Sequence, residues 1–203
     1  MTIRAVLFDF SNTLFRLEHP SFAVHGELMR ALTSPFGLPD GFAVDAATWE
    51  RRDLDPVAHR EAHVEVLASA GAEDPDGFYE SLLSPTRWQA YPDAAVALGT
   101  HLRTAVVSNI GWDVRTVFAR HGVLGRVDEF VLSYEEGAVK PDPKLFEVAC
   151  ERLGVEPREA LMIGDSEEAD GGARAVGCRF ELVEPLPTQE RPDALLRAIS
   201  RHA

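Results

Sequence analysis

The sequence predicts an α/β fold in which helices cover both faces of a doubly wound parallel sheet, with a helical subdomain inserted after the first strand. Two observations predict the sheet: short apolar runs recur along the chain, and segments with helical periodicity separate them. The third observation is a stretch of about 85 residues without a strand-like run, which is too long for one crossover helix and so predicts the insertion.

The first predicted strand is a nearly continuous apolar run from Ile3 to Phe8. Such a run is typical of a strand that is buried on both faces of a parallel sheet. We expect four further strands of the same kind at residues 104–107, 130–132, 160–163 and 180–183.

Helices are expected between these strands. The clearest has apolar residues at the i, i+3, i+4 and i+7 positions between Phe146 and Leu153, after the helix-starting run Pro141-Asp142-Pro143. Gly154 predicts where this helix ends. Further helices are expected at residues 93–102, 113–121 and 169–176, and from residue 193 to the end.

The long gap between the first two strands carries helical periodicity of its own. Proline and glycine residues between Pro35 and Gly41 separate two amphipathic stretches, the second of which runs from His59 to Ala70. We therefore predict a core domain of residues 1–16 and 92–203, and a helical cap domain of residues 17–91.

Composition limits the possible partners. The 203 residues carry a formal net charge of −13, which argues against nucleic acid as a partner, because nucleic-acid affinity comes largely from lysine and arginine. No apolar run reaches the roughly 20 residues needed to span a bilayer, so a cytoplasmic protein with no membrane partner is expected. The two cysteines, Cys150 and Cys178, have no metal-ligand spacing and are expected to be reduced packing residues.

Polar residues gather where the predicted strands end. In an open parallel sheet, ligands bind outside the carboxyl ends of the strands, near the point where the strand order reverses. Asp9 and Asp165 would repel each other there unless a hard cation lay between them, and Mg²⁺ suits such a carboxylate pair. Lys140 and Ser108 would then contact the oxygens of a phosphoryl group. The sequence therefore predicts a phosphoryl-transfer site.

These residues also occur in a recognisable order. The chain has Asp9-x-x-x-Thr13, then Ser108-Asn109, then Lys140-Pro-Asp-Pro, then Gly164-Asp165-Ser166-x-x-x-Asp170. This order resembles the four-motif signature of the haloacid dehalogenase (HAD) superfamily, over residues 1–16 and about 91–183. The resemblance implies a Rossmann-like core and a hydrolase of the phosphatase type, and the insertion corresponds in position to the helical cap of that family.

The resemblance also implies a role for each residue. Asp9 would be the nucleophile that forms an aspartyl-phosphate, and Mg²⁺ would be bound by Asp9, Asp165 and the backbone carbonyl of Ser11. Phosphate binding falls to Ser108, Asn109 and Lys140, and supporting roles fall to Thr13 and Asp170. The implied substrate is a small phosphorylated metabolite.

One position departs from the family pattern. Phosphatases of the family usually carry a second aspartate two residues after the nucleophile, as general acid and base, whereas this chain has Ser11. General acid-base catalysis typically contributes about 10²- to 10⁴-fold. The activity could therefore favour leaving groups that need no proton, or use a cap residue such as His19 or His25. The aspartyl-phosphate could also persist, as in P-type ATPases, or the protein could be a phosphate-responsive binding or regulatory protein without turnover.

Two other branches of the superfamily fit less well. Phosphonatases need a cap lysine, but the only lysines are Lys140 and Lys144, both outside the predicted cap. Haloacid dehalogenases use a similar aspartate without metal, typically with tyrosine two residues after it and without the acid that Asp165 represents. Dehalogenation is therefore the third alternative.

Four other side chains have more ordinary interpretations. His59 and His63 share one otherwise apolar helical stripe, which favours packing histidines over metal ligands. Arg51 and Arg52 are expected on a solvated helix face rather than on an anionic substrate. Trp112 could line the mouth of the site or anchor the start of a helix.

Overall fold

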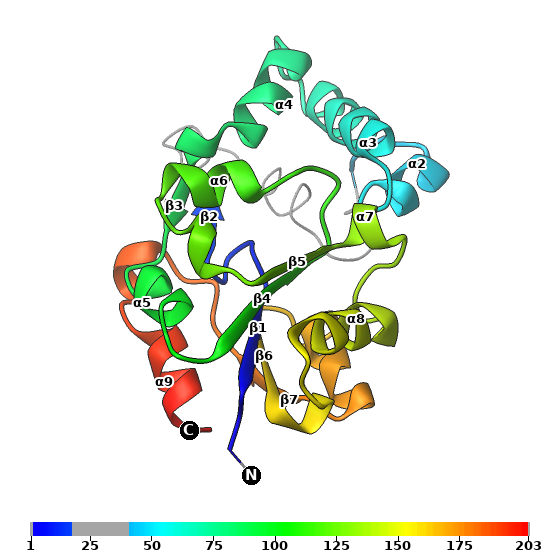
Figure 1. The fold of residues 1–203 in the computed structure, drawn as a ribbon. Helices are drawn as coiled ribbons and strands as arrows, with labels where there is room; N and C mark the ends of the chain where they lie inside the picture. The colour runs from blue at the N-terminus through cyan, green and yellow to red at the C-terminus, as the bar shows by residue number, and fades with distance from the viewer. Residues whose placement is uncertain (1, 18–40, 203) are drawn as a thin grey trace.

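The computed structural model describes residues 2–17 and 41–202. Its centre is a five-stranded parallel sheet with the order β5-β4-β1-β6-β7, shown edge-on in Figure 1. The strands are β1 (Ala5–Phe8), β4 (Arg103–Ser108), β5 (Glu129–Leu132), β6 (Ala160–Gly164) and β7 (Arg179–Leu182). The predicted parallel α/β sheet is confirmed, with each strand within two residues of its expected position.

The central strand β1 shows why the sheet needs a layer of helices on both faces. All four of its residues are buried, and successive side chains point to opposite faces. Val6 and Phe8 belong to one hydrophobic core and Ala5 and Leu7 to the other. The nearly continuous apolar run in the sequence reflects this two-sided burial.

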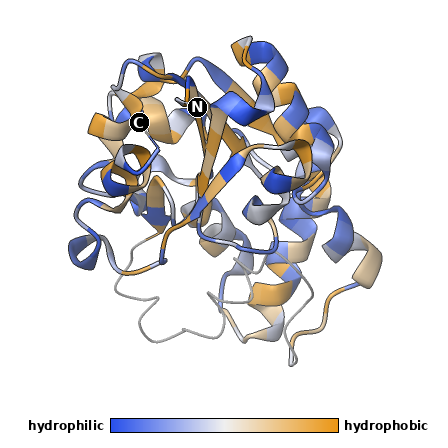
Figure 2. Ribbon diagram, turned by 90° about the horizontal axis from the view of Figure 1, so that it is seen from below, coloured by the Kyte–Doolittle hydropathy of each residue, from blue (hydrophilic) through white to orange (hydrophobic). Residues whose placement is uncertain are grey.

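Helices α5 (Ala94–Leu98), α6 (Arg115–Arg120) and α9 (Ala194–Ser200) cover the face that includes Val6 and Phe8. Helix α8 (Pro143–Leu153) and the 3₁₀ segment η5 (Asp170–Val176) cover the other face. Figure 2 shows the hydrophobic strands enclosed between these helices. The shorter elements are η2 (Pro85–Arg87), η3 (Leu124–Arg126), α7 (Ser133–Glu136), η4 (Pro157–Glu159) and η6 (Thr188–Glu190).

Helix α8 begins and ends as the sequence predicts. The side chain of Asp142 caps its first turn by accepting a hydrogen bond from the Lys144 amide, and Pro143 occupies the first turn, where no amide hydrogen is needed. Gly154 ends the helix in a left-handed conformation, with φ of 62°. Helix α8 begins three residues after Lys140, so its start helps to fix the position of that lysine.

The segment expected as a helix at residues 169–176 is instead the 3₁₀ segment η5. Two glycines, Gly171 and Gly172, weaken α-helical propensity there. A Cβ atom at Gly172 would lie 2.6 Å from the Cβ of Pro141, so the residue is glycine because η5 packs closely against the Lys140-Pro141 segment. Close packing of η5 brings Asp170, its first residue, towards Lys140.

The inserted segment forms a separate group of helices above the carboxyl ends of the strands (Figure 1). Its described helices are α2 (Ala46–Arg51), α3 (Pro56–Ser69) and α4 (Pro75–Leu83), which share a hydrophobic core of their own. The expectation that the insertion contains no strand was wrong. The short strands β2 (Phe15–Leu17) and β3 (Trp88–Ala90) pair antiparallel at its base, and three residues are too few to produce a readable sequence pattern.

Two expectations about composition can also be compared with the structure. The thiols of Cys150 and Cys178 are buried and free, with their Sγ atoms 3.8 Å apart in the core between α8 and β7. Within the described part of the chain, no helix has both the length and the hydropathy that crossing a bilayer requires. The domain boundaries at residues 16 and 92 remain a prediction, and β2 and β3 lie close to both of them.

Candidate active site

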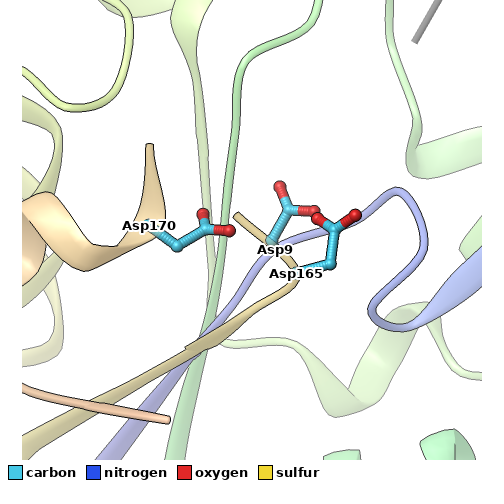
Figure 3. A group of neighbouring side chains, drawn as sticks. All are labelled: Asp9, Asp165 and Asp170. Carbon is cyan, nitrogen blue, oxygen red and sulfur yellow. The ribbon is translucent and has the colours of Figure 1, made fainter. Parts of the chain in front are cut away.

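Three carboxylates converge at the carboxyl edge of the sheet. Asp9 follows β1, Asp165 follows the adjacent strand β6, and Asp170 begins η5. One oxygen atom from each lies within 4.8 Å of the others, and Figure 3 shows all three side chains pointing into a shared space. The segments that follow β1 and β6 pack on opposite faces of the sheet, so the cluster lies where the winding reverses.

Lys140 lies among these carboxylates. Its ammonium group donates to Asp9 Oδ1 at 2.7 Å, to Asp170 Oδ1 at 2.6 Å and to the carbonyl of Val107 at 2.9 Å. The side chain is only 3% exposed, and all three hydrogens of the ammonium group have an acceptor. A single buried cation therefore balances part of a charge of up to −3.

The negative charge that Lys140 does not balance affects the pKa values of these groups. Burial raises the pKa of Asp9 to about 6, although the positive charge of Lys140 opposes this shift. Burial, followed by the negative charges of Asp9 and Asp170, raises the pKa of Asp165 to about 7. Burial lowers the pKa of Lys140, but the nearby carboxylates Asp170 and Asp9 outweigh it, so the net shift is upward. Lys140 stays charged, and the carboxylates still lack positive charge.

These residues fit a divalent cation. Both oxygens of Asp170 are already engaged, Oδ1 by Lys140 and Oδ2 by the backbone amide of Ser166 at 3.0 Å. Asp9 Oδ1 accepts hydrogen bonds from Lys140 and Ser108. The atoms that remain for a metal are Asp9 Oδ2 and the Asp165 carboxylate. A pair of hard oxygen donors with excess negative charge is what Mg²⁺ prefers. Asp9 and Asp165 are thus the residues that would hold it.

The raised pKa values predict how stability depends on pH without Mg²⁺. The folded pKa values of Asp9 and Asp165 exceed the ordinary value of 3.8, so their contribution to stability is full below pH 3.8 and is lost as the pH rises through about 6 to 7. Mg²⁺ binds the deprotonated pair and should restore stability most strongly at pH 8. At a free concentration about 100 times its Kd, the gain is about 2.7 kcal/mol, or roughly 5–11 °C in Tm.

Thermal unfolding at pH 5 and pH 8, with and without Mg²⁺, checks this expectation. Asp165→Asn should remove most of the gain at pH 8. A Mg²⁺-induced shift that is equal at both pH values, or that persists in Asp165→Asn, would contradict the assignment of these two carboxylates.

The structure brings Ser108 and Asn109 to the same edge. The hydroxyl of Ser108 donates to Asp9 Oδ1 at 3.2 Å. The side-chain amide of Asn109 donates to the Lys140 carbonyl at 3.0 Å, and its oxygen accepts the Lys140 amide at 2.6 Å. In this structure Asn109 therefore holds the backbone of Lys140 by two hydrogen bonds.

The turn after Asp9 is held in an unusual conformation. Asn12 has φ of 55°, the left-handed region that asparagine tolerates better than most residues. The guanidinium of Arg191 donates to the Asn12 carbonyl at 2.7 Å and to the Thr13 carbonyl. Thr13 is fully buried. Arg191 was missed in the sequence because it lies far along the chain, outside every motif.

A cavity of about 160 Å³ lies between the carboxylates and the helical insertion. Its polar walls come from the core residues Asp9, Ser11, Asn12, Ser108, Asn109, Lys140, Asp165 and Asp170, and from the inserted residues Arg52, Asp53, His59, His63 and Tyr79. Apolar residues, among them Leu17, Leu82, Trp88 and Trp112, form the rest. The predicted site residues other than the buried Thr13 therefore share one cavity.

The inserted helices correct one expectation. Arg51 is exposed and pairs with Asp55, as a solvated face requires, but Arg52 is 6% exposed and lines the cavity. Its guanidinium lies 4.1 Å from the ring centroid of Trp49 and donates to the Trp49 carbonyl at 2.8 Å. The tight turn after α2 directs Arg51 to the surface and Arg52 to the cavity. The residue types alone did not predict this difference.

Other side chains agree with their expected environment. His59 and His63 are buried packing residues with rings stacked 4.0 Å apart, and both also face the cavity. Trp112 does both things proposed for it, because it lines the cavity and packs edge-on against Phe10. His19 and His25, the suggested substitutes for the missing acid, lie outside the described residues.

Comparison with known proteins agrees with this arrangement. Residues 3–177 match the model of the haloacid dehalogenase-like hydrolase family. Haloacid dehalogenase-like hydrolase domain-containing protein 3 of Mus musculus is 36% identical over 124 residues, which cover 57% of this chain and 49% of that protein. A glyceraldehyde 3-phosphate phosphatase of Methanopyrus kandleri is 27% identical over 94% of this chain and 91% of its own length.

Further similar proteins include both types of chemistry. An (S)-2-haloacid dehalogenase 4A of Burkholderia cepacia is 27% identical over 87% of this chain and 80% of its own length. Among solved structures, a HAD phosphatase from Thermococcus onnurineus superposes with a TM-score of 0.60 at 28% identity, covering 90% of this chain and 86% of that one. Sheet order, strand-end carboxylates and the family match agree: the chain is a hydrolase that belongs to the haloacid dehalogenase-like family.

Proposed function

We propose that the protein is a Mg²⁺-dependent phosphohydrolase that acts on a small phosphorylated metabolite through an aspartyl-phosphate on Asp9. The observation that carries this proposal is the environment of Asp9. One oxygen, Oδ1, is held by Lys140 and Ser108, while Oδ2 receives no hydrogen bond from a described side chain and can face a phosphoryl group and a cation. The phosphatases among the similar proteins support the same chemistry.

The proposed reaction has two displacements at phosphorus. A carboxylate oxygen of Asp9 attacks, the bond from phosphorus to the leaving oxygen breaks, and the electron pair departs with the leaving group. Water then attacks the aspartyl-phosphate, and the Asp9 carboxylate is regenerated as phosphate leaves. A bound Mg²⁺ would supply positive charge to the phosphoryl oxygens.

The other side chains position the phosphoryl group. Lys140 is fixed by Asp170 and by the Val107 carbonyl, so its charge is preorganised and costs little reorganisation during the reaction. Ser108 offers a hydroxyl beside Asp9, and Asn109 holds the Lys140 backbone in place. The cavity of about 160 Å³ suits a small substrate.

Ser11→Asp tests the effect of the missing acid. Ser11 lines the cavity, two residues after the proposed nucleophile, so an aspartate there is placed to protonate a leaving alkoxide. We expect kcat on alkyl phosphates to rise by roughly 10²-fold, with little change for acetyl phosphate, whose leaving group needs no proton. Steady-state kinetics on both substrates check this. A fall on both would show that position 11 needs serine.

Two alternatives can be tested with the same preparation. Halide release from a 2-haloacid in the presence of a chelator would favour dehalogenation, to which the Burkholderia cepacia relative draws attention. If no phosphate ester or acyl phosphate turns over, but beryllium fluoride with Mg²⁺ raises Tm, a phosphate-responsive binding protein is favoured. Mg²⁺-dependent phosphate release without halide release supports the proposed function.

A further inference from the structure

Two buried side chains of the insertion, His59 of α3 and Tyr79 of α4, form a polar pair on the cavity wall. They are 6% and 3% exposed, and His59 Nδ1 lies 2.9 Å from the Tyr79 hydroxyl. Among the residues that the structure describes, the other ring nitrogen, Nε2, has no hydrogen-bond partner. The pair therefore presents one unused polar atom in an enclosed site that a substrate would occupy.

The hydrogen-bond pattern favours one tautomer of His59. Burial, with the charges of His63 and Arg52, holds the pKa of His59 well below 6.5, so its ring is neutral near pH 7. Burial also raises the pKa of Tyr79 to about 12, so that hydroxyl keeps its proton. His59 Nδ1 is the acceptor available to this hydroxyl among the described residues. If Nδ1 accepts the hydroxyl hydrogen, the ring hydrogen lies on Nε2.

The ring of His59 lies against the core. A Cβ atom at Gly111 would lie 2.5 Å from His59 Cβ and 2.7 Å from Cδ2, the ring carbon bonded to Nε2. Gly111 follows Ser108 by three residues, in the loop after β4. The absence of a side chain at Gly111 thus lets the ring lie against the segment that also presents Ser108.

The position of the ring is fixed from its other side. His63 stacks on His59 at a centroid separation of 4.0 Å, and His63 Nδ1 donates to the His59 carbonyl at 2.7 Å. The hydroxyl of Ser133, which begins α7 after β5, donates to the Asp53 carbonyl and so ties the insertion to the core. These contacts limit the movement of His59, as a directional hydrogen bond to substrate requires.

We propose that the His59 Nε2–H group donates a hydrogen bond to the leaving-group oxygen of the substrate, and that Tyr79 is the positioning residue that sets its tautomer. The proposal rests on the phosphohydrolase function above. It assigns to His59 the stabilisation of the leaving group, which Ser11 does not supply as an aspartate would. A neutral imidazole stabilises developing negative charge by hydrogen bonding but releases its proton reluctantly. The hydrogen bond therefore matters most where the leaving oxygen departs as a more basic anion, such as a phenolate, and least for acyl phosphates.

The test compares leaving groups rather than one substrate. We would measure kcat/KM with Mg²⁺ for acetyl phosphate and for a series of aryl phosphates of increasing phenol pKa. His59→Leu should lower kcat/KM by about 10²-fold for the least acidic phenols and by less than about threefold for acetyl phosphate. The plot of log(kcat/KM) against leaving-group pKa then becomes steeper.

Conservative variants separate the hydrogen bond from the fold. His59→Gln places an amide nitrogen near the Nε2 position and should recover at least about tenfold of the loss on poor leaving groups. Tyr79→Phe keeps the packing but removes the hydroxyl that sets the tautomer of His59. Its slope of log(kcat/KM) against leaving-group pKa should therefore fall between those of the unchanged protein and His59→Leu. His101→Leu, a change at an exposed histidine, should leave the slope unchanged. Equal Tm values show that the variants are folded.

Each result bears on the proposal in a defined way. Loss by the same factor on every leaving group, or no recovery in a folded His59→Gln, would show that His59 only supports the structure and would overturn the proposal. If the unchanged protein hydrolyses none of these phosphates, the proposed function fails, and the assignment of His59 fails with it. The two failures are distinguishable because only the second removes the activity of the unchanged protein.

Discussion

Asp9→Asn is expected to abolish phosphate release, by roughly 10⁴-fold or more in kcat, because the amide lacks the nucleophilic oxygen pair of the carboxylate. The substitution keeps side-chain volume and leaves Lys140 paired with Asp170 at 2.6 Å. It also removes one negative charge from a cluster that has too little positive charge to balance it. Tm in EDTA at pH 8 should therefore be equal to or higher than that of the unchanged protein. Kinetics and thermal unfolding on the same samples check both expectations.

Two observations make this result specific. Asp76→Asn, the same chemical change at an exposed residue of the helical insertion, should retain activity, because Asp76 forms a surface ion pair with Arg60 and is not among the described residues that line the cavity. Rapid acid quenching during turnover should trap one phosphoryl group on the unchanged protein and none on Asp9→Asn, as measured by mass spectrometry of the peptide that contains residue 9. Turnover that survives in Asp9→Asn would eliminate this residue as the nucleophile.

The sheet was predictable because its signal is local and strong. A strand buried on both faces, such as β1, must be apolar at every position, and the polar residues that follow it mark the edge where ligands bind. The same logic identified Asp165 after β6 and the order of motifs that links them. Contact between Lys140 and Asp9, 131 residues apart in sequence, then follows from topology rather than from any local pattern.

The cap side of the cavity was not predictable in the same way. Arg51 and Arg52 are chemically identical neighbours, and only the turn after α2 buries one and exposes the other. His59 carries the pattern of a packing histidine, and it is one, yet the space left at Gly111 also places its ring against the core. Arg191 supports the turn after Asp9 across 179 residues of chain without any motif. Such contacts depend on how elements pack, which periodicity does not describe.

Lys140→Met is expected to lower the free energy of unfolding by about 3–5 kcal/mol at pH 8 without Mg²⁺, because it leaves two buried carboxylates without a cationic partner. Methionine keeps most of the stem, so packing is largely preserved, but Asp9 and Asp170 lose the cation at 2.7 and 2.6 Å. Proton uptake limits the cost: the pKa of Asp9 is already about 6 beside Lys140, and removing that charge raises it further. The loss should therefore shrink as the pH falls towards 5.

The chain itself offers a matched control, because Lys144 is its one other lysine and lies exposed at the start of α8. Lys144→Met changes the same atoms four residues away and should alter the free energy of unfolding by less than about 1 kcal/mol. Adding Asp170→Asn to Lys140→Met should recover part of the stability, because one unpaired carboxylate is removed, whereas Asp170→Asn alone should destabilise. Urea unfolding of the four variants at pH 5 and pH 8 gives the coupling free energy. A loss in Lys140→Met that is independent of pH and insensitive to Asp170→Asn would mean that packing, not charge, is what Lys140 contributes, and the electrostatic account of this site would then be wrong.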